Sequence, residues 1–134
     1  MYVPILLQEE VNIAINMLSQ DGQSYSNKVD LISKIVSNFK QLYMMAKDKK
    51  APISLLAELV SKGFKYGFNG YWLALVKKDI ENMNTFKLEC EKLAKAGEQI
   101  AKIVEGKDSE STKSWRDKNQ NFEDWCRRYI NGSL

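Results

Sequence analysis

Apolar residues recur at helical spacing over residues 27–48, and this pattern constrains the fold more than any other feature of the chain. Steps of three and four residues place them on one face of a helix. Ser26 stands where it would cap the start of this helix, and Pro52 follows its end. A helix with one apolar face has to bury that face, so the pattern predicts packing against other helices. The stripe consists of Ile32, Ile35, Val36, Phe39, Leu42, Tyr43 and Ala46.

Similar spacing predicts further helices on both sides of this segment. The predicted ranges are 4–19, 52–62, 71–105 and 121–131. Residues 71–105 form one helix or two, and a break is expected near 84–85 because Asn84 and Thr85 are poor helix formers. The polar run 107–114 predicts a linker before the last helix. With 134 residues, the chain has the size of one domain. We predict an all-α, single-domain bundle of five or six helices over 1–134.

Residues 63–72, GFKYGFNGYW, contain five aromatic residues and three glycines. Glycine is unfavourable in a helix interior and bends easily, so we expect a glycine- and aromatic-rich loop at a corner between two helices. A β-hairpin turning at Asn69-Gly70 is the alternative. The aromatic side chains either fill the core where helix ends meet or form an exposed patch that binds a partner. These side chains are Phe64, Tyr66, Phe68, Tyr71 and Trp72.

The composition argues against most catalytic chemistry. There is no histidine, which removes the commonest general base and metal ligand. Cys90 and Cys126 are not spaced for a metal, and each falls on the apolar face of a predicted helix, so we expect both to be small buried hydrophobic residues. Neighbouring carboxylates diverge on helices, and no glycine-rich phosphate-binding motif occurs. We expect no catalytic residue, cofactor or metal, and we keep a carboxylate-based hydrolase only as a third hypothesis.

The charge pattern supports an alternative function. The net charge is +3, and lysine outnumbers arginine 17 to 3. Lysines along residues 28–50 would contact phosphates without sequence preference. Arginine, the commonest reader of guanine edges, is absent before Arg116. A helical protein associated with nucleic acid is therefore the alternative hypothesis. Its contacts, which also serve as an electrostatic rim for a protein partner, are Lys40, Lys47, Lys49 and Lys50.

Two other apolar surfaces need a partner inside or outside the chain. Apolar residues in 86–104 alternate in steps of four and three, which is typical of coiled coils, so a homodimer through 86–104 is one hypothesis. Gly97 lies on this seam and would permit close approach of another helix. The aromatic residues near the C-terminus are expected to dock on the protein's own body, with docking on a partner as the alternative. They are Trp115, Phe122, Trp125 and Tyr129.

These observations favour a non-enzymatic module that binds another protein, as an adaptor, assembly subunit or inhibitor. We expect the contacts to come from the five aromatic residues of 63–72. The first residues, MYVPILLQEE, lack the features of a secretory signal, and no apolar run approaches the length of a membrane span, so we expect a soluble, cytoplasmic protein. Small size and the lack of histidine are also compatible with an inhibitor carried by a phage or plasmid.

Overall fold

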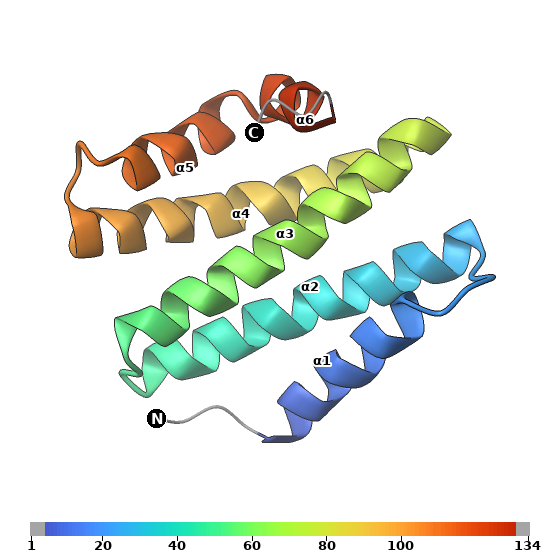
Figure 1. Ribbon diagram of the computed structural model, residues 1–134, viewed down its shortest axis with the longest axis horizontal. Coiled ribbons are helices and arrows are strands. Elements are labelled where there is room, and N and C mark those ends of the chain that lie inside the picture. The colour runs from blue at the N-terminus through green and yellow to red at the C-terminus, as the bar shows by residue number, and fades with distance from the viewer. Residues whose placement is uncertain (1–4, 131–134) are drawn as a thin grey trace.

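The computed structural model describes the backbone of residues 5–130 and the side chains of residues 7–126, and this part of the chain contains helices and no strand. Consecutive helices pack on one another, and α6 returns to α3 (Figure 1). This arrangement confirms the predicted all-α bundle. The helices are α1 (Ile5–Leu18), α2 (Tyr25–Asp48), α3 (Ile53–Lys77), α4 (Ile80–Glu105), α5 (Glu110–Gln120) and α6 (Phe122–Ile130).

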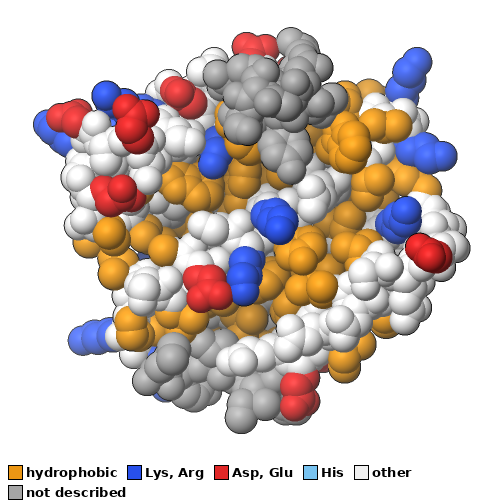
Figure 2. All heavy atoms as spheres, in the orientation of Figure 1, with side chains coloured by type: hydrophobic (Ala, Val, Ile, Leu, Met, Phe, Trp, Pro, Cys, Tyr) orange, Lys and Arg blue, Asp and Glu red, His pale blue; other side chains and the backbone are white. Residues whose placement is uncertain are grey.

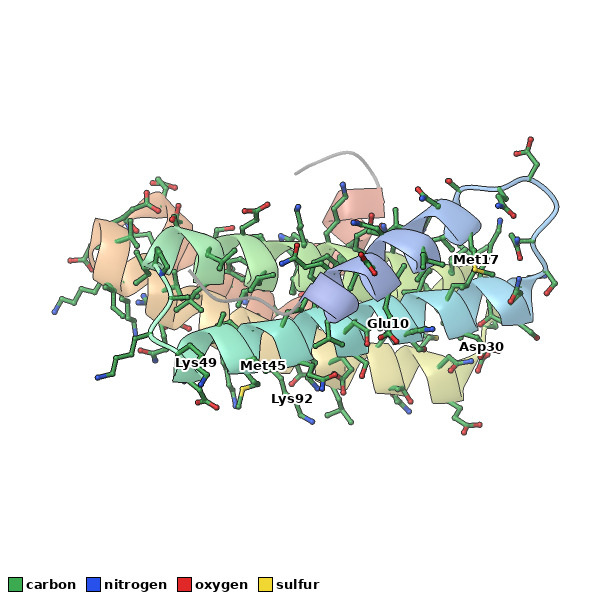
Figure 3. All side chains as sticks on the ribbon, turned by 90° about the horizontal axis from the view of Figure 1, so that it is seen from below. Glu10, Met17, Asp30, Met45, Lys49 and Lys92 are labelled. Atoms are coloured by element: carbon green, nitrogen blue, oxygen red, sulfur yellow. The ribbon has the colours of Figure 1, made fainter. Side chains whose placement is uncertain are left out.

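The helices lie in two layers. Helix α3 packs on both α2 and α4, and α1 packs on α2. Figure 3 shows α1 and α3 on the same side of α2. Met45 of α2 and Lys92 of α4 project from the opposite side of the molecule, away from α1 and α3 (Figure 3). Because α1 has α2 as its main neighbour, the space between α1 and α3 is not closed by direct helix packing.

Residues 63–72 are helical and lie inside α3, so the predicted loop and the end of a helix at residue 62 were both wrong. Gly63, Gly67 and Gly70 are spaced by four and three residues, which places them on one face of α3. All three are buried. The glycines therefore create a narrow helix face for packing and do not create a bend.

The glycine face of α3 packs closely on α4. A Cβ atom placed on Gly67 would lie 2.9 Å from the sulfur of Cys90, and one placed on Gly70 would lie 2.5 Å from Cε1 of Phe86. Such contacts are shorter than packed carbon atoms tolerate. Close approach of α3 and α4 outweighs the cost of about 1 kcal/mol that a glycine brings to a helix interior.

The break after α3 occurs at residues 78–79 and not at 84–85 as predicted. Lys78 adopts the left-handed conformation (φ 57°, ψ 34°), and Asp79 is the N-cap of α4. The Asp79 carboxylate accepts hydrogen bonds from the backbone N–H of Asn82 (3.2 Å) and from the Tyr25 hydroxyl (2.9 Å). The side-chain amide of Asn82 also donates to this carboxylate (2.7 Å), and this hydrogen bond is the largest of the causes that lower the pKa of Asp79. The break is therefore placed by the side-chain cap at Asp79 and not by the weak helix formers Asn84 and Thr85.

The start of α2 differs from the prediction by two residues. Ser24 is the N-cap, and its Oγ accepts a hydrogen bond from the backbone N–H of Asn27 (3.1 Å). The predicted cap, Ser26, lies inside the first turn of the helix. The stripe of α2 is otherwise placed as its periodicity indicates.

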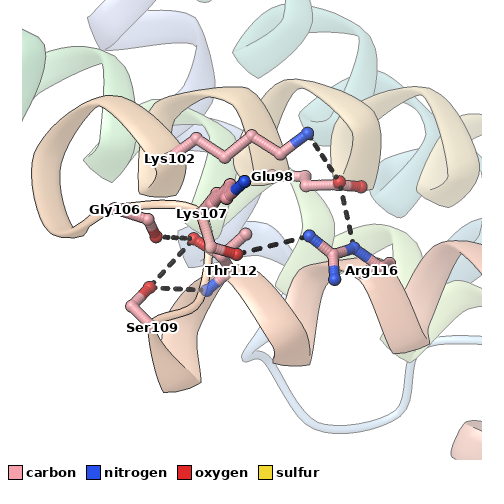
Figure 4. A network of polar contacts seen from close by, with 7 residues as sticks. All are labelled: Glu98, Lys102, Gly106, Lys107, Ser109, Thr112 and Arg116. Carbon is pink, nitrogen blue, oxygen red and sulfur yellow. Dashed lines mark hydrogen bonds and ion pairs between the residues drawn. The ribbon is translucent and has the colours of Figure 1, made fainter.

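The predicted linker 107–114 contains the start of α5. Ser109 caps this helix, with its Oγ accepting from the backbone N–H of Thr112 at 3.1 Å. The fully buried hydroxyl of Thr112 donates to the carbonyl of Gly106 (2.8 Å) and accepts from Ser109 (2.9 Å), as Figure 4 shows. Local capping by Ser and Thr made a polar segment helical, where composition alone indicated a linker.

Beside this turn, one ion pair joins α5 to α4 and a second lies within α4. The Glu98 carboxylate lies 3.1 Å from Lys102 Nζ and 3.5 Å from Arg116 Nε (Figure 4). Burial raises the pKa of Glu98, but hydrogen bonds and the charge of Lys102, with a further hydrogen bond from Arg116, outweigh burial and lower it overall. At the residues that precede Glu98 and Arg116, a Cβ atom on Gly97 would lie 2.5 Å from the Trp115 ring. Gly97 thus permits close approach, as predicted, and its neighbour is α5.

The apolar seam of 86–104 is buried within the chain. Phe86, Cys90, Leu93 and Ile100 are each at most 7% exposed, while Val104 is 56% exposed. Helices α3 and α5 pack on α4, so most of this seam is used within the chain, and a homodimer through 86–104 stays a prediction. Within residues 5–130, no helix combines the length and apolar character needed to cross a membrane.

Candidate functional site

The five aromatic residues predicted to contact a partner do not form one surface. Phe64, Phe68 and Tyr71 are at most 4% exposed and belong to the core. Their interpretation as contact residues was wrong because α3 is continuous and buries this face. Tyr66 is half-buried and Trp72 is 41% exposed. At 100° per residue these two side chains leave α3 in different directions.

The C-terminal aromatic residues cover the buried face of α3. The rings of Trp125 and Phe68 pack edge to face with their centroids 4.5 Å apart, and the centroids of Phe122 and Tyr71 are 5.1 Å apart in the same arrangement. Trp115 meets Phe64 at 5.3 Å. Docking on the protein's own body is therefore confirmed for Trp115, Phe122 and Trp125. The side chain of Tyr129, also predicted to dock, lies outside the described residues.

A hollow with a volume of about 500 Å³ lies between α1 and α3 and has α2 beneath it. We call it the α1–α3 groove. Figure 2 looks onto this face and shows apolar side chains exposed between charged side chains. The groove follows from the fold, because both α1 and α3 pack on α2 and leave a space between them. Its lining is Gln8, Val11, Asn12, Ile15, Phe39, Leu42, Leu55, Glu58, Leu59, Lys62, Lys65 and Tyr66.

The floor of the groove is apolar and rigidly packed. Val11, Phe39, Leu42 and Leu59 are buried members of one core cluster. Tyr66 stacks on Phe39 with ring centroids 6.1 Å apart and planes inclined by 12°. Binding here would not need the floor to rearrange, which reduces the entropy lost on association.

The rim of the groove carries a net positive charge. Its one carboxylate, Glu58, already pairs with Lys62 at 2.9 Å. Lys65 is exposed and forms no ion pair with any other residue that the structure describes. Surface pairs such as Glu58–Lys62 contribute little to stability, about 0.3–0.5 kcal/mol, so both remain available to a ligand.

The lysines predicted as electrostatic contacts lie along and after α2. Lys40 forms an ion pair with Glu89 of α4, so its positive charge is already neutralised within the chain. The ammonium of Lys47 lies 5.9 Å from the centre of the Tyr43 ring. Lys49 and Lys50 are exposed beyond the end of the helix. Only part of the predicted basic strip is therefore directed to solvent, and nucleic-acid binding stays a prediction.

The two thiols offer no nucleophile. Cys90 and Cys126 are buried, as predicted. Burial raises the pKa of Cys90 and raises that of Cys126 to about 12, so neither is a thiolate at neutral pH. Among the described side chains, no group of three or more carboxylates or thiols is placed to hold a metal ion.

Sequence reasoning did not identify the α1–α3 groove. Its residues come from three helices. Whether α1 packs against α3 or only against α2 depends on tertiary packing, which local sequence patterns do not reveal. The sequence signal for it was weak: Gln8 and Asn12 lie beside the apolar face of the first helix, and both line the groove.

Comparison of the chain with models of known protein families, with curated proteins and with solved structures finds no match. The function therefore has to be argued from the site itself.

Proposed function

We propose that this protein is a non-enzymatic module that binds another protein through the α1–α3 groove. The occupant that we propose is an amphipathic helix of the partner, with its apolar face in the groove and an acidic residue beside Lys65. One observation carries the proposal: an open hollow of about 500 Å³ with a preformed apolar floor and a charged rim.

The dimensions of the groove favour a helix. Its α3 wall extends from Leu55 to Tyr66, a length of about 16 Å at 1.5 Å per residue. Apolar anchors at positions i, i+4 and i+7 of a helix span about 10 Å and fit within this length. Two helices already flank the space, so an incoming helix would pack on α1, α2 and α3 by ordinary side-chain interdigitation.

The charges on the rim of the groove indicate that the partner carries an acidic residue. The rim has two lysines and one carboxylate, and the carboxylate is paired with Lys62. A partner with an acidic residue near Lys65 would gain a charge-assisted contact at the edge of the groove, where such contacts mainly raise the association rate and the specificity. Tyr66, the one predicted aromatic contact that lines the groove, would contribute apolar area and its hydroxyl.

Selection of displayed peptides tests this proposal. A library of random helical peptides is selected on the wild-type protein after depletion on Asn12→Trp, in which an indole on exposed Asn12 fills the groove. The matched control for depletion is Lys92→Trp, which places the same side chain on exposed Lys92, on the opposite side of the molecule (Figure 3). We expect peptides with apolar residues at helical spacing and at least one acid, bound by wild type and Lys92→Trp alike.

Charge reversal then tests how the peptides are oriented. Lys65→Glu should weaken the binding of a selected peptide by about ten-fold, because a charge-assisted hydrogen bond is replaced by repulsion. Lys92→Glu should leave the affinity unchanged. Peptides that bind Asn12→Trp as well as wild type, or a selection that yields no helical pattern, would contradict the proposal.

A further inference from the structure

A second hollow lies on a neighbouring face of α3, between α3, α5 and α6. We call it the Lys118 hollow. Its volume is about 200 Å³, and its walls are mainly aromatic. The lining is Ser61, Phe64, Lys65, Phe68, Trp115, Lys118 and Trp125.

The ammonium group of Lys118 lies among aromatic rings. Its Nζ is 4.3 Å from the centre of the Trp115 ring, 4.9 Å from that of Trp125 and 5.3 Å from that of Phe64. Ring faces attract a cation and compensate part of the hydration that it loses. Burial lowers the pKa of Lys118.

Among the described side chains, no carboxylate balances this charge. None lines the hollow, and Lys118 forms no ion pair with another residue of the described part of the chain. A second ammonium, that of Lys65, lies at the edge of the same hollow. A partly desolvated cation without a counter-ion is unfavourable, and an incoming anion would relieve that cost.

We propose that the Lys118 hollow binds a small aromatic carboxylate, whose carboxylate pairs with Lys118 and Lys65 and whose ring lies against the side chains of Phe68, Trp115 and Trp125. The hollow shares Lys65 with the rim of the α1–α3 groove, but the proposal does not depend on the proposed protein-binding function. It combines what such a ligand needs: apolar walls for the ring and two cations for the acid.

The size of the hollow limits the ligand. An engineered apolar cavity of about 150 Å³ binds benzene, so a hollow of about 200 Å³ accommodates one ring with a short acidic substituent. Two fused aromatic rings with a long side chain would extend into solvent. Phenylacetate is therefore the probe that matches the hollow.

The three tryptophans provide a direct readout. Trp115 and Trp125 line the hollow, whereas Trp72, one helical turn beyond Phe68 in α3, does not line it and is 41% exposed. Phenylacetate is titrated into the nitrogen-labelled protein, and the indole N–H signals are followed by NMR. We expect the signals of Trp115 and Trp125 to shift and to saturate, while that of Trp72 stays in place as an internal control. Phenylacetamide, which has the same shape without the charge, should bind about ten-fold more weakly.

Substitutions assign the interaction to Lys118. Lys118→Met keeps a long apolar stem and should weaken phenylacetate binding about ten-fold, whereas Lys118→Arg should retain most of it. Lys113→Met, at an exposed lysine of the same helix, is the matched control and should bind as wild type does. Thermal unfolding of each variant shows whether it is folded, and peptide binding in the α1–α3 groove should be unaffected by Lys118→Met.

The same chemistry occurs in a free acid and in the C-terminal aromatic residue of a peptide. N-acetyl-Gly-Phe with a free carboxylate distinguishes them, because its additional backbone must fit the hollow too. Binding of phenylacetate but not of this peptide supports a free acid, while tighter binding of the peptide supports a chain terminus. Equal shifts with phenylacetate and phenylacetamide, unchanged binding in folded Lys118→Met, or no saturable shift of Trp115 and Trp125 would overturn the proposal.

Discussion

Gly70 of α3 lies directly against the aromatic ring of Phe86 in α4, without room for a methyl group between them. A Cβ atom on Gly70 would be 2.5, 2.6 and 2.7 Å from three carbons of the ring. Phe86 is 1% exposed and is enclosed by the main core cluster. The ring therefore cannot move aside without displacing its other neighbours.

Gly70→Ala is expected to lower the free energy of unfolding by about 2–3 kcal/mol, because overpacking of a tight core outweighs the gain of about 1 kcal/mol in helix propensity. Denaturant unfolding followed by circular dichroism measures the change. Gly63→Ala should cost less, since its nearest neighbour is a methyl carbon of flexible Leu93 at 3.2 Å. Asn69→Ala, next to Gly70 on the same helix, should remain within about 0.5 kcal/mol of wild type. A Gly70→Ala protein as stable as wild type would show that α3 and α4 are less closely packed.

The sequence predicted the helices best where a strong apolar period coincided with an ordinary polar boundary. The stripe of α2 is the clearest case, and its observed end at Asp48 is the predicted one. The prediction failed at 63–72 because glycine was treated as a helix breaker. The spacing of Gly63, Gly67 and Gly70 is helical, and this spacing was the signal that would have identified a packing face.

Other features depend on tertiary structure and have little local signal. Residues 110–114 are helical because Ser109 and Thr112 form hydrogen bonds with each other, and Thr112 donates a further one to the carbonyl of Gly106. The α1–α3 groove exists because α1 has α2 as its main neighbour. Lys118 had a partial signal, since it lies three residues after Trp115 and seven before Trp125 and so shares their helical face in the sequence.

The two cysteines are expected to be inert to thiol reagents in the native protein. Cys90 and Cys126 are at most 1% exposed, and burial raises the pKa of both thiols, that of Cys126 to about 12. Labelling with a disulfide reagent at pH 8 should therefore require transient opening of the core and be far slower than in concentrated guanidinium chloride. Ser61→Cys, at an exposed position of α3, is the control and should react at once. Rapid native labelling of one thiol would show that α6 or α4 opens readily.

Glu98 should make the fold sensitive to acid. Its pKa is lowered from the ordinary value of 4.5 despite burial, because Lys102 and Arg116 favour the charged form, so the unfolded chain binds this proton more tightly than the folded one. The stabilisation is therefore complete above the unfolded pKa and is lost as the pH falls through the lower folded pKa. Glu98→Gln should be about 0.5–1 kcal/mol less stable than wild type at pH 7, and the difference should shrink toward pH 3. Urea unfolding at both pH values checks this, with Glu105→Gln, at the exposed end of α4, expected to match wild type at each. A stability difference between Glu98→Gln and wild type that is the same at both pH values would mean that the charge of Glu98 does not secure α5 on α4.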